Sequence, residues 1–374
     1  MKKFFSFQLQ VTSYKLQVTS YAFCLLLSAF CFLPVSVIAQ KSNQKIETRT
    51  EVFTKNFKVN AKDILEVHTS FTKVVFQEWD KNEVDFTTTV TLNRATEKDM
   101  AQLLNAIKIT TNQSGKKTNY KLSLSGNNLN KIGNYEINLL VKMPKDIFLN
   151  ITSSFGNVEL EDAFNNFNAD IDFGDITIKN LYGNKNVVNI TQGKLKMEQA
   201  DELTLNMSFS TANMLKVDML KLNSSFSTLK MERAKEIELN SSQDKISINN
   251  SVEKIKGEVD FGTLKIGSLK YSFICTKFSF SKITIDEIQR SFTNINIVSS
   301  QSTIVLNVPR DQSFAFDYSG SFTKFKDEDI RLNDATFKGG SNSVQMSGFY
   351  GKNRDSGKKI KIEASFGSVS LFER

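Results

Sequence analysis

The side chains that could perform acid–base chemistry are few in this sequence. His68 is the only histidine among 374 residues, so a triad built on an imidazole has one candidate, and no nucleophile motif lies near it. Asp170, Asp172 and Asp175 form a carboxylate cluster, and glycosidases use paired carboxylates on one face as acid and base. Asp172 occupies a turn position, however, and its neighbours alternate between two faces. We therefore predict a structural or exposed role for His68, a turn-forming role at Asp172, no catalytic residues and no enzyme.

Other reactive or ligand-binding side chains are also sparse. Neither metal-ligand spacing nor the Gly-rich nonapeptide of calcium-binding β-rolls occurs, so we predict no metal site and no cofactor. Cys275 is the only cysteine after residue 39; a single thiol cannot form an intramolecular disulfide, and we expect it to be a small buried hydrophobe. Trp79, the only tryptophan, is expected to pack at the N-terminal end of the core. A tryptophan exposed on a flat face would instead indicate stacking on a sugar ring.

A recurring triplet indicates which elements position these side chains. Ser, Thr or Asp is followed by Phe or Gln, and then by Gly, Ser, Thr or Asp. Ten such triplets begin at Ser70, Ser154, Asp172, Thr191, Ser208, Ser225, Ser242, Asp260, Ser279 and Ser365. From Ser154 to Ser279 successive starts lie 17 to 19 residues apart, a period too short for helical repeats and suited to one coil of a β-solenoid. We predict an all-β fold, a single-stranded parallel β-helix (β-solenoid) of 17–19-residue coils.

Within each coil, apolar residues stand at fixed offsets behind the Phe or Gln. Leu229, Met231 and Ala234 follow Phe226 at +3, +5 and +8, and the middle coils extend the pattern to +11 and +13. The residues at +3 and +5 form one pair with period 2, and those at +11 and +13 form another. These two pairs predict two short strands joined by a corner, with the polar residues between the apolar ones facing water.

The triplet itself is expected to form the other corner. Its first side chain can bond the backbone two residues on, and Gly in the third position tolerates a positive φ where the chain bends. The middle residues should then stack into one column, with the glutamines Gln192 and Gln243 passing amide hydrogen bonds along it.

The coils should be closed at both ends, because an open terminal coil is an exposed sheet edge. Residues 40–152 are predicted to form an N-terminal β-rich cap with one helix at Thr96–Ile107, residues 153–301 the coils, and residues 302–374 a C-terminal β-rich cap. In the C-terminal cap we expect a hairpin through Lys352–Gly357. Pro144 and Pro309 follow similar strands, and each should mark a strand end.

Residues 1–39 have the pattern of a secretory signal peptide. Lys2 and Lys3 precede an apolar run, and Val37-Ile38-Ala39 offers a small-residue cleavage site. A retained anchor is the alternative, but Pro34 interrupts the run, so we predict no stable membrane span after cleavage. The net charge of +8 is spread over interleaved Lys and Glu, which predicts no nucleic-acid partner.

Several of these motifs occur together in a known family. The stretch Trp79-Asp80-Lys81-Asn82-Glu83-Val84, the phrase Met143-Pro144-Lys145-Asp146 and the Ser-Phe-Gly or Asp-Phe-Gly corners resemble a bacterial family described as putative adhesins. The resemblance covers nearly all of the chain after the leader. It implies an exported single-stranded parallel β-helix of unknown function.

We therefore expect an exported, non-enzymatic β-solenoid scaffold, adhesin-like, in the periplasm, at the cell surface or outside the cell. Its partner would be an unknown protein or glycan of the envelope or surface. One alternative is a carbohydrate-active β-helix enzyme or glycan binder, for which a cleft lined by convergent acids would be evidence. Another is a periplasmic accessory of envelope sensing.

Overall fold

The computed structural model describes residues 47–126, 134–328 and 330–374. Residues 44–374 form one compact unit. Its described part contains 24 strands and the single helix α1, which confirms the all-β prediction. The predicted signal peptide, residues 1–39, lies outside the described residues.

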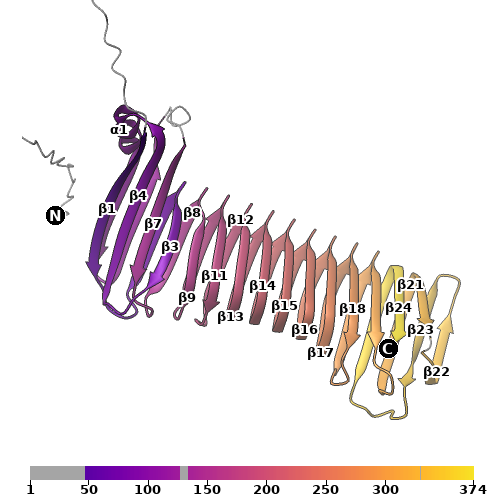
Figure 1. The fold of residues 1–374 in the computed structure, drawn as a ribbon. Coiled ribbons are helices and arrows are strands. Elements are labelled where there is room, and N and C mark those ends of the chain that lie inside the picture. Colours follow the sequence, from indigo (N-terminus) through magenta and orange to yellow (C-terminus); the bar gives the residue numbers. More distant parts are fainter. Residues whose placement is uncertain (1–46, 127–133, 329) are drawn as a thin grey trace, which may run out of the picture. The chain divides into compact units, whose positions relative to one another are not determined.

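The middle of this unit is a ladder of parallel strands, drawn side by side in Figure 1. We call the chain from one corner triplet to the next a rung. Each middle rung is one long strand rather than the two short ones expected: β13 (Lys194–Ser208), β14 (Thr211–Ser225), β15 (Thr228–Ser242), β16 (Lys245–Asp260) and β17 (Thr263–Ser279). Each pairs in parallel with the next, so that Leu195 lies beside Ala212 and Leu229 beside Ile246. Residues one repeat apart in sequence are therefore direct neighbours in space.

Shorter strands build the rungs on either side of this stretch, where each rung is divided in two. Before the long strands come β8 (Phe148–Ser154), β9 (Val158–Ala163), β10 (Phe167–Asp172), β11 (Asp175–Leu181) and β12 (Asn186–Thr191). After them come β18 (Lys282–Ile288), β19 (Asn294–Ser300) and β20 (Thr303–Val308). Here the two-strand prediction holds, and all of these pairings are parallel.

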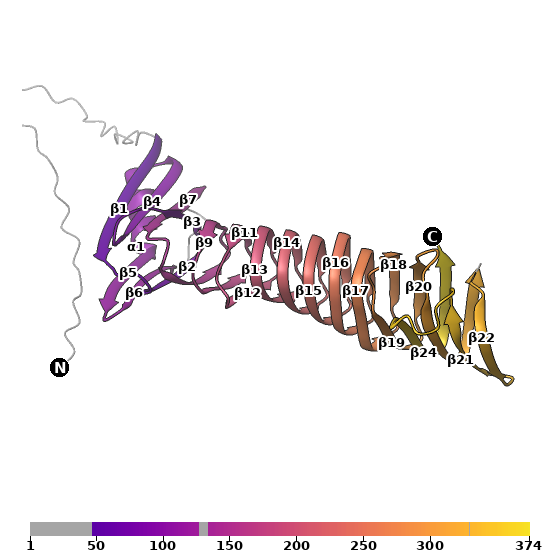
Figure 2. The ribbon, with the colours of Figure 1, turned by 90° about the horizontal axis from the view of Figure 1, so that it is seen from below.

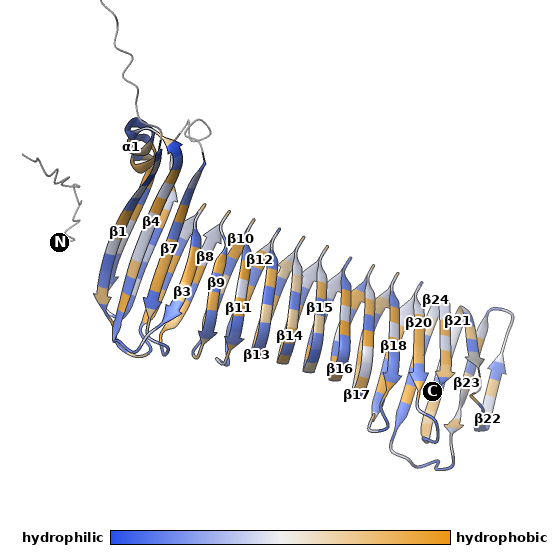
Figure 3. Ribbon diagram, viewed as in Figure 1, coloured by the Kyte–Doolittle hydropathy of each residue, from blue (hydrophilic) through white to orange (hydrophobic). Residues whose placement is uncertain are grey.

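Alternation along each strand separates the core from water (Figure 3). Leu229 and Ile237 are 2% and 4% exposed, whereas Lys230 and Glu236 are exposed. The residues at +3 and +5 of successive rungs thus form continuous buried columns, and the inward and outward assignment from the sequence is confirmed.

The corner triplets correct one prediction about glycine. The residue with positive φ is the middle one, Phe or Gln; Phe226, for example, has φ +52°. Glycine stands in the third position because of close backbone contact: a Cβ on Gly174 would lie 2.1 Å from the carbonyl oxygen of Gly156. Ser takes this position in other rungs, where its hydroxyl accepts a hydrogen bond from the rung before it, as from Ser210 N to Ser227 Oγ at 3.0 Å.

Two further corners were missed in the sequence. Ser300-Gln301-Ser302 and Ser321-Phe322-Thr323 have the same positive φ at Gln301 and Phe322. The triplet chemistry fits both, but they lie beyond the regular 17–19-residue spacing. The third position follows the same rule, since Ser302 Oγ accepts from Ser281 N at 3.1 Å.

The N-terminal end combines parallel rungs with an antiparallel layer. Its elements are β1 (Glu47–Lys58), β2 (Ile64–Ser70), β3 (Lys73–Glu78), β4 (Glu83–Ala95), α1 (Glu97–Ala106), β5 (Ile107–Ser114), β6 (Lys117–Leu124) and β7 (Tyr135–Met143). β2 and β3 pair in parallel with β8 and β9, whereas β4 lies antiparallel between β1 and β7. The predicted helix is confirmed, with Thr96 and Asp99 forming a capping box.

The C-terminal end departs from sequence order (Figures 1 and 2). Its strands are β21 (Phe314–Glu328), β22 (Leu332–Gly339), β23 (Ser343–Tyr350) and β24 (Lys359–Glu373). β24, the last strand, lies between β19 and β20 on one side and β21 on the other, parallel to all three. The predicted hairpin through Lys352–Gly357 is wrong, because β23 pairs antiparallel with β21 and β22. β24 contributes to the ladder instead, where its backbone groups are paired on both sides.

Candidate functional site

His68 and two residues of the aspartate cluster make local contacts within the ladder. His68 is a partly exposed residue of β2, and its Nε2 lies 3.9 Å from Glu66 Oε2. Asp170 accepts a hydrogen bond from the Asn189 side chain, and Asp175 Oδ1 accepts one from the backbone N of Lys194 at 3.0 Å. Asp170 and Asp175 therefore each bond to the next rung of the ladder.

Trp79 lies outside the core, contrary to the sequence prediction. The residue follows the end of β3, and its half-buried ring donates a hydrogen bond from Nε1 to the carbonyl oxygen of Glu83 at 2.7 Å. The ammonium groups of Lys81 and Lys142 lie over the ring, 4.9 and 5.9 Å from its centroid. The residue stands in the passage from β3 to β4, where the ladder gives way to the antiparallel layer, so it is not packed as the +8 residues of the later rungs are. Cation–π contacts stabilise it there.

Cys275 is buried in β17, 2% exposed. Burial raises the pKa of its thiol to about 12, so the reactive thiolate is disfavoured at neutral pH. The side chain packs as the small hydrophobe that the sequence predicted. Among residues 47–126, 134–328 and 330–374, no group of three or more side chains is placed to hold a metal ion.

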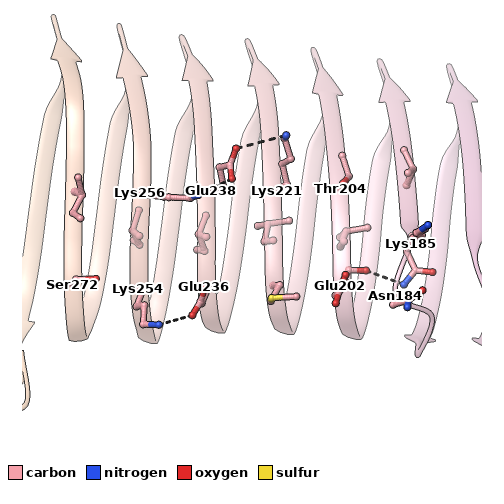
Figure 4. Close-up of a pocket in the computed structure, with 18 residues that line it drawn as sticks. Asn184, Lys185, Glu202, Thr204, Lys221, Glu236, Glu238, Lys254, Lys256 and Ser272 are labelled. Carbon is pink, nitrogen blue, oxygen red and sulfur yellow. Dashed lines mark hydrogen bonds and ion pairs between the residues drawn. The ribbon is translucent and has the colours of Figure 1, made fainter.

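A shallow depression of about 660 Å³ runs across the outer side of the later halves of β13 to β17 (Figure 4). Its charged side chains pair with one another between rungs: Lys254 Nζ lies 2.7 Å from Glu236 Oε1, and Lys256 Nζ lies 3.1 Å from Glu238 Oε2. These bonds raise the pKa of Lys254 and lower that of Glu238. Because Lys221, Lys254 and Lys256 are each paired with a glutamate of the next rung or the one before, most of the charge in the depression is neutralised, and we regard it as a solvated strand face.

The most unusual surface is formed by the middle residues of the corner triplets. Backbone hydrogen bonds link each corner to the next, as from Phe226 N to Ser242 O at 3.1 Å, and β24 inserts its corner before that of β21. We call the resulting row the phenylalanine ridge. Its members are, in spatial order, Phe71, Phe155, Phe173, Gln192, Phe209, Phe226, Gln243, Phe261, Phe280, Gln301, Phe366 and Phe322.

All nine phenylalanines of the ridge are about half exposed, between 47% and 56%. Neighbouring rings stack nearly parallel, with interplanar angles of 1° to 9° and centroid distances of 4.7 to 5.0 Å; the pairs are Phe71–Phe155, Phe155–Phe173, Phe209–Phe226, Phe261–Phe280 and Phe322–Phe366. The predicted column is thus present. Stacking covers at least one face of every ring, and Phe155 has a ring on both sides.

The three glutamines interrupt these stacks at regular intervals. Gln192, Gln243 and Gln301 stand three rungs apart in the ladder, so the expected chain of amide hydrogen bonds from one to the next is wrong. The ridge is divided by them into short phenylalanine stacks of two or three rings. All three side chains are exposed.

Backbone conformation makes these large exposed rings an unusual choice. A left-handed backbone costs a residue other than Gly about 1 kcal/mol or more, and Asn or Gly would fit the corners with less strain. Ring stacking returns only about 0.5–1.5 kcal/mol per pair. Large exposed apolar surfaces commonly serve contact with a partner. We therefore take the phenylalanine ridge as the candidate functional site.

The sequence contained the signal for this site. The Phe and Gln positions recur with the corners, and this recurrence predicts one column. Their exposure could not be predicted, because an apolar residue that recurs with the core period has the pattern of a core residue. The left-handed backbone conformation of the middle residue determines that its side chain is exposed.

No protein-family model and no curated protein matches this sequence. Solved structures similar to the chain include a putative adhesin from Bacteroides fragilis, 17% identical, which covers 66% of this chain and 97% of that one with a TM-score of 0.36. A putative adhesin from Parabacteroides merdae is 11% identical, covering 86% and 96%, with a TM-score of 0.41. A putative lipid binding protein from Parabacteroides distasonis is 12% identical, covering 86% and 96%, with a TM-score of 0.27. Two of the three bear the description of the family that the sequence resembles.

Proposed function

We propose that this protein is an exported, non-enzymatic scaffold that makes contacts in the cell envelope or at the cell surface, with the phenylalanine ridge as its contact surface. The observation that carries the proposal is the row of nine half-exposed phenylalanines in left-handed corners. Such a row is too large and too regular to be scattered surface apolarity.

The architecture supports a scaffold role. We interpret the ladder as one single-stranded parallel β-solenoid, residues 153–301, capped by residues 40–152 and 302–374. In a solenoid each rung depends on its neighbours for burial, so the core is continuous and the corner positions are held at a fixed spacing. A rigid row of identical groups suits repeated contacts along an extended partner.

The leader supports export. Lys2 and Lys3, the apolar run and the small residues before Gln40 have the composition of a signal peptide. In the part of the chain that the structure describes, no helix is long and apolar enough to cross a membrane. We accordingly propose the periplasm, the cell surface or the outside of the cell as the location.

Of the alternatives, a carbohydrate-active enzyme would require acids that are free to act on a substrate, whereas Asp170 and Asp175 are hydrogen-bonded to the next rung. Glycan stacking would require open ring faces, and in the ridge stacking covers at least one face of every ring. An accessory role in envelope sensing would use the same contact surface with a different partner, so we retain it as a variant of the proposed function.

The test is sedimentation of the purified full chain with isolated envelopes from the cells that make it. The double variant Phe209→Ser/Phe226→Ser removes one stack from the middle of the ridge and should lower the sedimenting fraction several-fold. Circular dichroism confirms that the variant is folded.

The matched control is Phe337→Ser. Phe337 is 66% exposed but belongs to β22, outside the ridge. The Phe337→Ser variant should sediment with envelopes to the same extent as the unaltered protein. Equal sedimentation of all three proteins would exclude the ridge as the contact surface.

A further inference from the structure

The area of the phenylalanine ridge is that of a protein–protein interface. A phenylalanine side chain offers roughly 200 Å², so nine rings that are each about half exposed present roughly 900 Å². The largest apolar patch on a typical monomer is about 300–600 Å². One side of a standard protein–protein interface covers about 800 Å². The ridge alone is therefore large enough to hold a partner.

The spacing of the ridge restricts the kind of partner. Its rings repeat every 4.7 to 5.0 Å, the distance between hydrogen-bonded strands. A partner that contacts every ring must repeat at the same interval over the same length. A second copy of this chain has that property by construction.

The glutamines specify a register between two such ridges. Gln192, Gln243 and Gln301 occupy every third rung, and the rungs between them carry phenylalanine. An amide buried against a phenyl ring would lose its hydrogen bonds, so a stable pair must set glutamine against glutamine. A shift of one rung would break this match at all three positions.

Two-fold symmetry meets this requirement, because an isologous interface applies one surface to itself. If the two ridges run parallel, each residue faces its own copy. If they run antiparallel about Gln243, Gln192 faces Gln301 and Phe226 faces Phe261. Gln243 faces Gln243 in both arrangements.

We propose that the phenylalanine ridge binds a second copy of this chain, ridge against ridge, with Gln243 at the two-fold axis. The inference rests on the proposed function in taking the ridge as the contact surface, and it identifies the partner there as a second copy of this chain, including copies held in the envelope. The interface buries ring edges between the copies and pairs the glutamine amides across the axis.

Disulfide trapping tests the register directly. In the full chain with Cys24 and Cys31 changed to Ser, the remaining Cys275 is buried. Gln243→Cys in this background should give a disulfide-linked dimer under mild oxidation. The parent without the new cysteine should give none.

A second set of variants determines the orientation. Gln192→Cys alone should cross-link if the ridges are parallel. If they are antiparallel, it should cross-link only when mixed with Gln301→Cys. Either result supports the pair, whereas cross-linking of Gln243→Cys with neither would contradict the register.

Sedimentation equilibrium of the chain without added cysteines provides an independent measurement. Phe209→Ser/Phe226→Ser should raise the dimer dissociation constant at least ten-fold, and Phe337→Ser should leave it unchanged. A monomer at every concentration, together with no cross-linking of Gln243→Cys, would overturn the inference.

The same variants separate this inference from the proposed function. If no dimer forms but Phe209→Ser/Phe226→Ser still loses envelope binding, the ridge serves a different partner and only the inference fails. If the dimer forms and envelope binding is unaffected by the same substitutions, self-pairing stands and the proposed envelope contact fails.

Discussion

Two columns of apolar side chains run through this molecule with the same period, and the backbone separates them. Leu229 belongs to the inner column and is 2% exposed, while Phe226, three residues earlier in the same rung, is 48% exposed. Leu229 lies in an extended strand, whereas Phe226 has a left-handed backbone at the corner. Periodicity and apolarity therefore identify a column of residues but do not show whether that column is buried in the core or exposed to solvent.

The largest expected effect comes from comparing an aspartate placed in the core column with one placed in the phenylalanine ridge. Leu229→Asp should abolish cooperative folding, because an unpaired carboxylate in the core costs several kcal/mol. Phe226→Asp should change the free energy of unfolding by only about 1 kcal/mol. Urea denaturation followed by circular dichroism measures both. Similar midpoints would contradict the distinction between core and ridge.

The third corner position gives the next largest effect. A Cβ on Gly174 would meet the Gly156 carbonyl oxygen at 2.1 Å, so Gly174→Ala should lower the free energy of unfolding by about 1–3 kcal/mol. Gly262→Ala is the control, since its nearest contact would be at 3.0 Å. We expect a smaller loss there. If the two variants had equal stability, close approach would not explain glycine at these corners.

Ring stacking along the ridge should give a smaller, measurable coupling. In a double-mutant cycle, Phe209→Asn and Phe226→Asn should show an interaction free energy of about 0.5–1.5 kcal/mol, because their rings stack at 4.8 Å. The pair Phe173 and Phe209, which Gln192 separates, should show none. Equal coupling in both pairs would mean that stacking is not its source.

Glu78, at the end of β3, is neither fully buried nor exposed. Its Oε1 is buried without a hydrogen-bond partner, and burial, followed by the charges of Asp162 and Glu161, raises its pKa. The folded state therefore holds the proton more tightly than the unfolded state, and stability falls as pH rises through the folded pKa.

Glu78→Gln should accordingly raise the urea midpoint slightly at neutral pH. The advantage should disappear on acidification below the ordinary pKa of a glutamate, where Glu78 is protonated in both states. The control is Glu198→Gln at an exposed position, which should leave the urea midpoint at neutral pH unchanged. A gain that is the same at acidic and neutral pH would mean that ionisation of Glu78 is not its cause.

The sequence was sufficient where the determinants are local. The alternation that buries Leu229 and exposes Lys230 comes from the two-residue period of a strand. The helix at Glu97–Ala106 follows from its capping box and apolar spacing. The ends of β7 and β20 beside Pro144 and Pro309 follow from the missing backbone donor.

The predictions failed where a residue's role depends on its neighbours in space. Trp79 has the spacing of a core residue, but Lys81 and Lys142 cover its ring outside the core. The hairpin at Lys352–Gly357 had suitable turn residues, yet β24 found better pairing in the ladder. Turn chemistry permits a hairpin but does not exclude another partner for the strand.

The sequence by itself determined the period of the rungs, the inward face of each strand and the corner where the middle residues gather. Only the tertiary structure decided the order of the last rungs, with β24 placed before β21, and the exposure of the ridge. The physical reason is that backbone hydrogen bonds are alike between any two parallel strands, so local sequence does not specify which rungs become neighbours. Burial of the open end of the core decides the order of the last rungs, and the left-handed backbone at the corners decides the exposure of the ridge.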